Sequence, residues 1–442
     1  MTSPTTAKSR LGHGFGRLWS AAIASNLADG IGRTAVPLIA TTLTHDPALI
    51  AGLTAVTFLP WLLFGIPAGM LLDRVDRRAA MAVANGIRFA VAAVVALLIA
   101  TDALTIWSLY ACVLAFGLGE TVFDNATTTV TPSLVTRDQL DRANGRMQSA
   151  EIVVQNFIAT PIAGFLFAAA IALPLWLTGA GFLVSVLLVL TIPVAAARAH
   201  MLGGEGGEAA PRPRMGAVVR FLWDDRFLRK MIVLTSITAS ALAFAQGSVV
   251  LLLLQTYSLP PSMVGVVTAV VGAGALVGAL SASGFVTRFG RGRVMYVAML
   301  LGGLGLLGVG LTGNMVAGIL AYALGAFGVA VWNVPWGALR QAIVPGAILG
   351  RAMGIVRTIG WGLTPIATVL GGFVARIDLR LPFLIGGVVV VVLALIATRL
   401  LLSAGRYGQS AVTSTAETST AETSTAETST PEVQTIPEGT AS

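Results

Sequence analysis

The fold of this chain is decided by the stretch Gly69-Met-Leu-Leu-Asp73-Arg74-Val-Asp76-Arg77-Arg78. The stretch ends one apolar run, near residues 48–72, and precedes another, near residues 79–100. As a helix, each run is long enough to cross the ~30 Å hydrocarbon layer of a bilayer. A charged turn between two such runs therefore predicts a hairpin of two membrane-spanning helices.

Apolar runs of similar length recur along most of the chain. Of its 442 residues, 55% are hydrophobic and only 11% are charged, whereas about 25% of the residues of an ordinary soluble domain are charged. A water-soluble surface cannot be made from this composition. We therefore predict an all-α membrane protein with twelve transmembrane helices, near residues 18–43, 48–72, 79–100, 105–130, 147–171, 175–197, 231–254, 262–286, 294–312, 315–338, 354–375 and 381–402.

The net charge of +8 comes from basic residues that gather in alternate links between the apolar runs. These links contain Arg74, Arg77, Arg78, Arg137, Arg142, Arg146, Arg288, Arg291, Arg293, Arg340 and Arg351, and the basic cluster between Arg198 and Lys230. The other links are short, and their only basic residues are Arg376 and Arg380. The positive-inside rule then predicts a multi-pass protein of the cytoplasmic membrane with both termini in the cytoplasm. Its macromolecular surroundings are the lipid bilayer and not nucleic acid.

The chain divides into five predicted segments. They are a cytoplasmic N-terminus (residues 1–17) without a removable signal peptide, a first six-helix half (18–198), a cytoplasmic linker (199–228), a second six-helix half (229–402) and a cytoplasmic tail (403–442). The linker includes a predicted amphipathic helix near residues 218–228 that would lie on the inner membrane face. The tail repeats Thr-Ser-Thr-Ala-Glu and is predicted to be disordered, so a solvated tail is favoured over a docking motif.

The two predicted halves carry traces of an internal duplication. Thr54-Ala55-Val56 matches Thr268-Ala269-Val270, and Phe123-Asp124 matches Trp332-Asn333 at a slightly smaller offset. Six helices followed by six related helices predict two pseudo-symmetric halves with a substrate site between them near the bilayer midplane. The halves differ in chemistry, because the second has no carboxylate within its apolar runs.

Charged residues within the apolar runs are the candidate functional residues, because an unpaired charge in hydrocarbon is costly. Asn26, Asp29 and Arg33 are spaced by three and four residues, so they share one stripe of a helix. We expect this stripe and the other polar residues of these runs to face a central cavity. The candidates for proton coupling or for lining the cavity are Asp29, Arg33, Arg88, Glu120, Asp124, Glu151 and Asn333.

Two interpretations of these charges compete. In the structural one, Asp29 pairs with Arg33, and Arg88 pairs with Glu120 or Asp124, so that the pairs fix helix packing. In the functional one, Asp29, Glu120, Asp124 or Glu151 binds a proton in one conformation and releases it in another, which drives antiport. Trp332 and Trp336 flank Asn333, and packing or a position at the membrane interface is favoured for them over lining a ligand path.

The stretch at residues 69–78 resembles the signature of the major facilitator superfamily, in which Gly and Asp four residues apart precede basic residues. The resemblance implies that this loop latches the cytoplasmic ends of the halves together in the outward-open state. The latch residues are Gly69, Asp73, Arg74, Arg77 and Arg78. Asp76 replaces the second glycine of the family pattern, so the loop geometry can differ here, and the second copy of the motif has lost its Asp.

A second group of motifs is similar to the bacterial macrolide-efflux and enterobactin-exporter branch of that superfamily. The group consists of Gly119-Glu-Thr-Val-Phe-Asp-Asn125, Pro132-Ser-Leu-Val135 and Arg142-Ala-Asn-Gly-Arg146. Thr160-Pro161-Ile-Ala-Gly164 is a partial version of an antiporter element and supplies a kink and a close-packing point. The resemblance implies efflux and favours antiport.

No motif indicates an enzyme, a metal centre or a cofactor, because the three histidines lie far apart and outside the apolar runs. We therefore predict a proton-driven exporter of a small amphipathic or hydrophobic compound, of the drug or siderophore class. An importer of a nutrient with the same fold is one alternative, and a non-transporting membrane receptor or assembly factor is another. The few amide and aromatic side chains of the second half favour export of a less polar compound.

Overall fold

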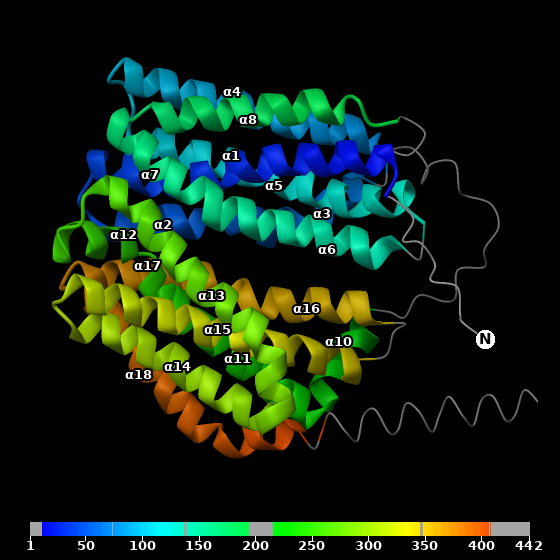
Figure 1. Cartoon of the computed structure of the whole chain (residues 1–442), viewed down its shortest axis with the longest axis vertical. Coiled ribbons are helices and arrows are strands. Elements are labelled where there is room, and N and C mark those ends of the chain that lie inside the picture. Colours follow the sequence, from blue (N-terminus) through cyan, green and yellow to red (C-terminus); the bar gives the residue numbers. More distant parts are fainter. Residues whose placement is uncertain are drawn as a thin grey trace, which may run out of the picture.

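The structure of the chain is a computed structural model that describes residues 11–72, 74–136, 139–193, 215–344, 348–405 and 407. In this part of the chain the regular elements are helices, most of which run roughly parallel to one axis (Figure 1). The N-terminal set comprises α1 (His13–Leu43), α2 (Pro47–Val56), α3 (Leu59–Leu72), α4 (Arg77–Ala100), α5 (Ile106–Leu134), α6 (Leu140–Ile152), the π-helical η2 (Val153–Ala159), α7 (Thr160–Ala169) and α8 (Leu173–Val189).

The C-terminal set follows the linker. It comprises α10 (Met215–Asp224), α11 (Arg226–Gln246), α12 (Val249–Leu251), the π-helical η3 (Leu252–Thr256), α13 (Pro261–Phe289), α14 (Arg291–Leu311), α15 (Met315–Ile343), α16 (Leu349–Gly362), α17 (Thr364–Ala375) and α18 (Leu381–Ile396). A short helix, Thr398–Gly405, continues α18 after a bend of 60°.

Each of the twelve predicted apolar runs corresponds to helical structure. Within the described residues, nine spans are long and apolar enough to cross a membrane, and the bent pair formed by α18 and Thr398–Gly405 is a tenth. The other two runs correspond to α8, an apolar helix of 17 residues, and to α1, which has 31 residues but carries Asn26, Asp29 and Arg33. The predicted all-helical membrane fold is therefore confirmed.

The helix bounds reproduce the internal duplication. The first residues of α2 and α13, Pro47 and Pro261, are separated by the same offset as Thr54 and Thr268. The helices α5 and α15 both have 29 residues, and their first residues are separated by the same offset as Phe123 and Trp332. A further match, Thr160-Pro-Ile-Ala163 with Thr364-Pro-Ile-Ala367, begins α7 and α17, so equivalent spans break at equivalent points.

The predicted amphipathic helix of the linker exists as α10, but its apolar face is not turned to lipid. Val218 and Leu222 are buried, and they pack in one cluster with Leu228 of α11 and Val356 of α16. The C-terminal set therefore covers the face that the sequence assigned to the membrane surface. The other linker residues, 199–214, and the predicted tail beyond Tyr407 lie outside the described residues.

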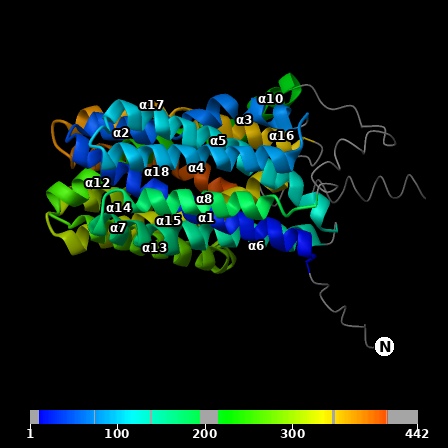
Figure 2. The same ribbon diagram turned by 90° about the horizontal axis from the view of Figure 1, so that it is seen from above.

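The two sets of helices are joined at one side of the membrane. We call the side with Arg77, Arg142 and Arg291 the basic side, which lies to the right in Figure 1, and the other the distal side. The most extensive contacts between the sets are made by α2 with α17 and by α7 with α13, near the distal side (Figures 1 and 2). On the basic side, α3 and α6 make no comparable contact with α16 in the part of the chain that is described.

Small residues make the close contact on the distal side possible. A methyl group added to Gly265 of α13 would overlap the backbone oxygen of Thr160 at the start of α7. A methyl group added to Gly372 of α17 would meet Ala51 and the backbone of α2. Glycine lets two helix backbones approach closely, which favours association where lipid supplies no hydrophobic driving force. The sets are therefore packed together on the distal side and diverge toward the basic side.

We expect Gly265→Ala to destabilise the protein by about 1–3 kcal/mol, because the added methyl group overpacks the contact between α7 and α13. Gly284→Ala is the matched control on the same helix, since an added methyl group there meets nothing within 4 Å. It should be neutral or stabilising by up to about 1 kcal/mol, because Ala is the better helix former. Thermal unfolding in detergent measures both effects, and equal shifts for the two variants would contradict this account of the contact.

Candidate functional site

A buried ion pair joins α1 to α4. The Arg88 guanidinium on α4 contacts the Asp29 carboxylate on α1, and the two side chains are 1% and 8% exposed. Arg88 also donates to Asn85 Oδ1 at 3.1 Å, and Asn85 donates to Ser185 Oγ of α8 at 2.9 Å. The guanidinium lies 4.1 Å from the centre of the Phe182 ring. Three helices are thus connected by a polar cluster that is closed to solvent.

A second ion pair lies on another face of α1 and is open to solvent. Arg33 contacts the Glu120 carboxylate on α5, and its Nη1 donates to Gln155 Oε1 of η2 at 3.3 Å. Gln155 in turn donates to Asn26 Oδ1 at 2.8 Å. The Arg33 side chain is 57% exposed and that of Glu120 is 15% exposed, although both lie near the middle of their helices. Solvent therefore reaches the middle of the bundle at this pair.

The stripe predicted on α1 is divided between these two pairs. Asn26 and Arg33 point toward η2 and α5, whereas Asp29 points toward α4. The predicted pairing of Asp29 with Arg33, and of Arg88 with Glu120 or Asp124, is wrong, and so is the expectation that Asp29 faces a cavity. Residues three and four apart are still separated by about 40–60° around a helix, so neighbouring helices can supply different partners.

Asp124 lies one turn after Glu120 on α5. It is half-buried, and its carboxylate has no hydrogen-bond or ion-pair partner among the described residues. Its carboxylate interacts electrostatically with four nearby charged groups, those of Glu120, Arg88, Glu151 and Arg33. Glu151 is exposed near the end of α6 and also acts on Arg33. Asp124 thus lies beside the solvent-accessible Arg33–Glu120 pair, and among the described residues no cation contacts its carboxylate directly.

The counterpart of Asp124 in the C-terminal set is Asn333 on α15, which is exposed and lies apart from the two ion pairs in the part of the chain that is described. Its neighbours Trp332 and Trp336 are 8% and 2% exposed and belong to the core of the C-terminal set. The tryptophans therefore pack in that core, as the favoured interpretation predicted. The charged cluster belongs to the N-terminal set.

The predicted latch lies at the turn from α3 to α4. Gly69 lies within α3 and Arg74 is exposed, whereas Asp73 lies outside the described residues. Arg77 Nη1 donates to the backbone oxygen of Thr129 on α5 at 3.0 Å, and Arg78 is half-buried. Arg77 thus connects this turn to its own set of helices.

Asp76, which replaces the glycine of the family pattern, caps the N-terminus of α4. Its carboxylate accepts from the backbone N–H groups of Arg78 at 2.9 Å and Ala79 at 3.3 Å. An aspartate that immediately precedes a helix commonly satisfies such free N–H groups. That pattern was present in the sequence, where Asp76 was considered only as a departure from the signature.

Sequence reasoning also missed the π-helical segment η2, which places Gln155 against α1. The Gln155 backbone oxygen accepts from Thr160 Oγ1 at 2.7 Å, and Pro161 follows at the start of α7. Proline lacks the N–H that continues an α-helical hydrogen-bond ladder, and π-helical turns are frequent at functional sites. Pro161 was the available signal, although it predicted only a kink.

No group of side chains suited to a metal ion occurs among the residues described.

A third ion pair connects the two sets on the distal side. Arg376, after α17, donates through Nε to Asp46 Oδ1 at 2.7 Å and through Nη2 to Oδ2 at 2.5 Å. Asp46 also caps α2 by accepting from Ala48 N at 2.9 Å. The hydrogen bonds from Arg376 are the main reason that the pKa of Asp46 lies below its ordinary value. The Asp46 side chain is 27% exposed and the Arg376 side chain is 47% exposed.

We expect Arg88→Met to destabilise the protein by about 3–5 kcal/mol, because the Asp29 carboxylate would be left buried without a cation. The double variant Asp29→Asn/Arg88→Met should recover a large part of this loss, since no charge then remains in the cluster. Thermal unfolding of the purified variants measures the difference. A double variant no more stable than Arg88→Met would show that the pair is not the source of the stability.

We expect Asp46→Asn to weaken closure of the distal side by the same amount at pH 5 and at pH 8. A lowered pKa means that the ion pair stabilises the closed contact above the ordinary aspartate pKa of ~3.9, and that this contribution is lost only as the pH falls through the lowered pKa. Spin labels on Thr42→Cys and Ile377→Cys, in a Cys112→Ser background, report the separation of the end of α1 from the turn that follows α17. The matched control is Asp102→Asn, at the link between α4 and α5 on the same side. An equal effect of both variants would contradict the role of the Asp46–Arg376 pair in closing the distal side.

Comparisons with known proteins agree with this architecture. Residues 8–430 match the family described as transmembrane secretion effector. The chain resembles solved structures of the nucleoside transporter NupG (D323A mutant; TM-score 0.72, 14% identity, 88% of this chain and 100% of that one) and of a bacterial homologue of the iron transporter ferroportin in an inward-facing state (TM-score 0.68, 16% identity, 90% and 100%). At these identities the likeness shows the fold alone.

Two groups of relatives match parts of the chain. An uncharacterized MFS-type transporter of Mycobacterium tuberculosis is 34% identical over 173 residues, which is 38% of this chain and 36% of that protein. Macrolide efflux protein A of Streptococcus pyogenes is 27% identical over 191 residues, 43% of this chain and 45% of that protein. The chain thus matches less than half the length of these relatives. With the family match along almost its whole length, it belongs to the transmembrane secretion effector family of major facilitator transporters.

Proposed function

We propose that this major facilitator transporter exports a small amphipathic or hydrophobic compound, of the drug or siderophore class, in exchange for protons across the cell membrane. The observation that carries the proposal is the solvent-accessible Arg33–Glu120 pair in the middle of the bundle, with Asp124 one turn away. The partial similarity to macrolide efflux protein A supports the direction of transport and the class of substrate. The apolar character of the C-terminal set supports a substrate that is less polar than a sugar.

The proposal places the basic side in the cytoplasm, in accordance with the positive-inside rule. The contacts of α2 with α17 and of α7 with α13 then close the outer side, and the transporter is open inward. An exporter in this state would take up its substrate from the cytoplasm or the inner leaflet. The two halves, residues 18–198 and 229–402, would rock about the midplane site to expose it on the outer side.

Within this scheme, Asp124 is the carboxylate that we assign to proton exchange. A carboxylate whose neighbour one turn away is Glu120 experiences like-charge repulsion, and binding a proton removes it. Asp29 is excluded from this role, because it is held by Arg88 and is closed to solvent. In the outward-open state Asp124 would take a proton from outside, and in the inward-open state it would release that proton to the cytoplasm. Substrate would move outward when the transporter passes from the inward-open to the outward-open state.

The turn between α3 and α4 is assigned the role of a latch that closes the cytoplasmic side in the outward-open state. Gly69, Asp73, Arg74 and Arg78 would contact the opposite half in that state. Arg77, which is bonded to Thr129, would keep the turn attached to α5 during the movement. Among the described residues, α3 and α16 make far less contact than α2 and α17 do, which is consistent with a latch that is open in the inward-facing state.

We expect inside-out vesicles that contain the protein to accumulate a substrate from a panel of macrolide antibiotics and siderophores when the lumen is made acidic. Asp124→Asn should reduce accumulation to the level of passive equilibration, while exchange of substrate without a gradient continues. Glu151→Gln, on the opposing helix α6, is the control and should retain uphill transport. Transport that ignores the proton gradient would contradict proton-driven export, and uphill transport by Asp124→Asn would contradict the role of that residue.

A further inference from the structure

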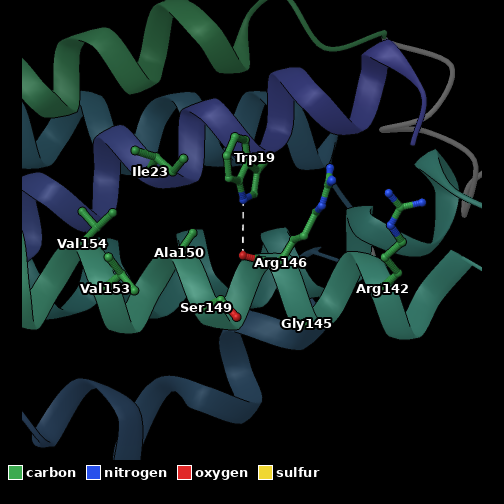
Figure 3. Close-up of a pocket in the computed structure, with 9 residues that line it drawn as sticks. All are labelled: Trp19, Ile23, Arg142, Gly145, Arg146, Ser149, Ala150, Val153 and Val154. Atoms are coloured by element: carbon green, nitrogen blue, oxygen red, sulfur yellow. Dashed lines mark hydrogen bonds between the residues drawn. The ribbon is translucent and has the colours of Figure 1, made fainter. Parts of the chain in front are cut away.

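A groove between α1 and α6 lies outside the proposed transport site. Its volume is about 510 Å³, and nine described residues line it: Trp19, Ile23, Arg142, Gly145, Arg146, Ser149, Ala150, Val153 and Val154 (Figure 3). Trp19 extends from α1 across the groove, and its indole Nε1 donates to the backbone oxygen of Arg146 at 3.3 Å. The volume lies within the ~300–1,000 Å³ that is typical of small-molecule sites.

The groove opens on the face of α6 that is turned away from the charged cluster. Glu151 acts on Arg33 and Asp124, and Gln155, one turn later, bonds to Arg33, so these residues mark the inner face. At 100° per residue, Arg142 and Ser149 lie about 160–180° around α6 from Glu151. In Figure 1, α6 lies at the surface of the bundle beside α1. The groove therefore faces the bilayer and not the space between the halves.

The surface of the groove is almost wholly apolar, and two arginines and a serine stand at one end of it. Arg142 and Arg146 lie in the first two turns of α6, at the basic side of the membrane, and Ser149 follows in the third turn. Ile23, Val153 and Val154 lie deeper, and Val153 is about 16 Å along the helix axis from Arg142. None of the nine described lining residues is acidic. Trp19 lies between the two ends, in a position that amphipathic rings favour at a membrane interface.

We propose that this groove binds an anionic phospholipid from the leaflet on the basic side. The head-group phosphate lies between Arg142 and Arg146, and one acyl chain follows Ile23 and Val153 into the membrane. Arginine forms charge-assisted hydrogen bonds with phosphate, and basic pockets between transmembrane helices hold anionic lipid head groups. A soluble phosphate would leave the apolar part of the groove unused.

The lipid would also complete the packing of the N-terminal set at this side. α1 and α6 diverge at the groove, and the hydrogen bond from Trp19 is a polar contact that connects them there. Both helices belong to the same half, so the bound lipid would move with that half during transport. The site would therefore be structural and would stay occupied through the cycle. This role is independent of whether the transporter is a proton-driven exporter.

Fluorescence of Trp19 provides the test. The full chain is reconstituted in phosphatidylcholine vesicles that contain increasing fractions of either brominated phosphatidylglycerol or brominated phosphatidylcholine, because bromine quenches a tryptophan in contact with it. The difference between the wild-type protein and Trp19→Phe isolates the Trp19 signal from that of the seven other tryptophans. We expect brominated phosphatidylglycerol to quench Trp19 at a mole fraction at least tenfold lower than brominated phosphatidylcholine.

Matched variants assign the preference to the two arginines. Arg142→Gln/Arg146→Gln should abolish it, since each basic residue near a membrane surface accounts for about a fivefold change in anionic-lipid binding. Arg291→Gln/Arg293→Gln removes the same charge at the start of α14 on the same side and should leave the preference intact. Arg142→Lys/Arg146→Lys keeps the charge and should retain most of the preference, and equal thermal unfolding of the Gln and Lys variants excludes a folding defect as the cause of any loss.

Four results would overturn the proposal. They are equal quenching of Trp19 by the two brominated lipids, an unchanged preference in Arg142→Gln/Arg146→Gln, loss of the preference in Arg291→Gln/Arg293→Gln, and displacement of the brominated phosphatidylglycerol by millimolar glycerol 3-phosphate. The last result would identify a site for a soluble phosphate in place of a lipid.

Discussion

Hydrocarbon offers no hydrogen-bonding partner, and this constraint shapes the whole structure. Backbone groups must be satisfied within each span, which leaves helices as the solution for this chain. Charged side chains must find partners within the protein, as Asp29 and Arg88 do in their ion pair, although Arg88 Nε is buried without a hydrogen-bond partner among the described residues. Asn85 and Ser185 complete the cluster around that pair, so α1, α4 and α8 are held together by polar contacts. The N-terminal set is built around this cluster.

The same constraint separates a structural pair from a candidate functional one on a single helix. Asp29 is closed to solvent and is held by Arg88, so a change in its protonation would weaken the polar cluster that joins three helices. Arg33 and Glu120 are reached by solvent near the middle of the bundle, where a charge can change without the cost of a dry interior. Asp124 adds a carboxylate without a direct partner among the described residues. Chemistry that accompanies a conformational change is best placed there.

The contact between the two sets has a different physical basis. It includes small residues in close approach, as at Gly265 and Gly372, and the partly exposed pair formed by Asp46 and Arg376. A buried apolar cluster also spans both sets, with Leu53 on one side and Leu253 on the other. Opening this contact would leave no buried charge without a partner, because its ion pair is already partly exposed. The buried ion pair and its hydrogen bonds lie within the N-terminal set, whereas apolar packing and a partly exposed ion pair lie between the sets. This division suits two halves that move as bodies.

The sequence by itself determined the helical membrane fold, the twelve apolar runs, the gathering of basic residues in alternate links and the internal duplication. These properties depend on local composition and on periodicity, which are visible without a structure. Only the tertiary structure decided that Asp29 pairs with Arg88 and Arg33 with Glu120, that α10 packs on protein, and that the sets are joined on the distal side. Partners of this kind come from helices far apart in the chain. Spacing along one helix restricts a side chain to a sector of about 60°, and packing between helices selects the neighbour within that sector.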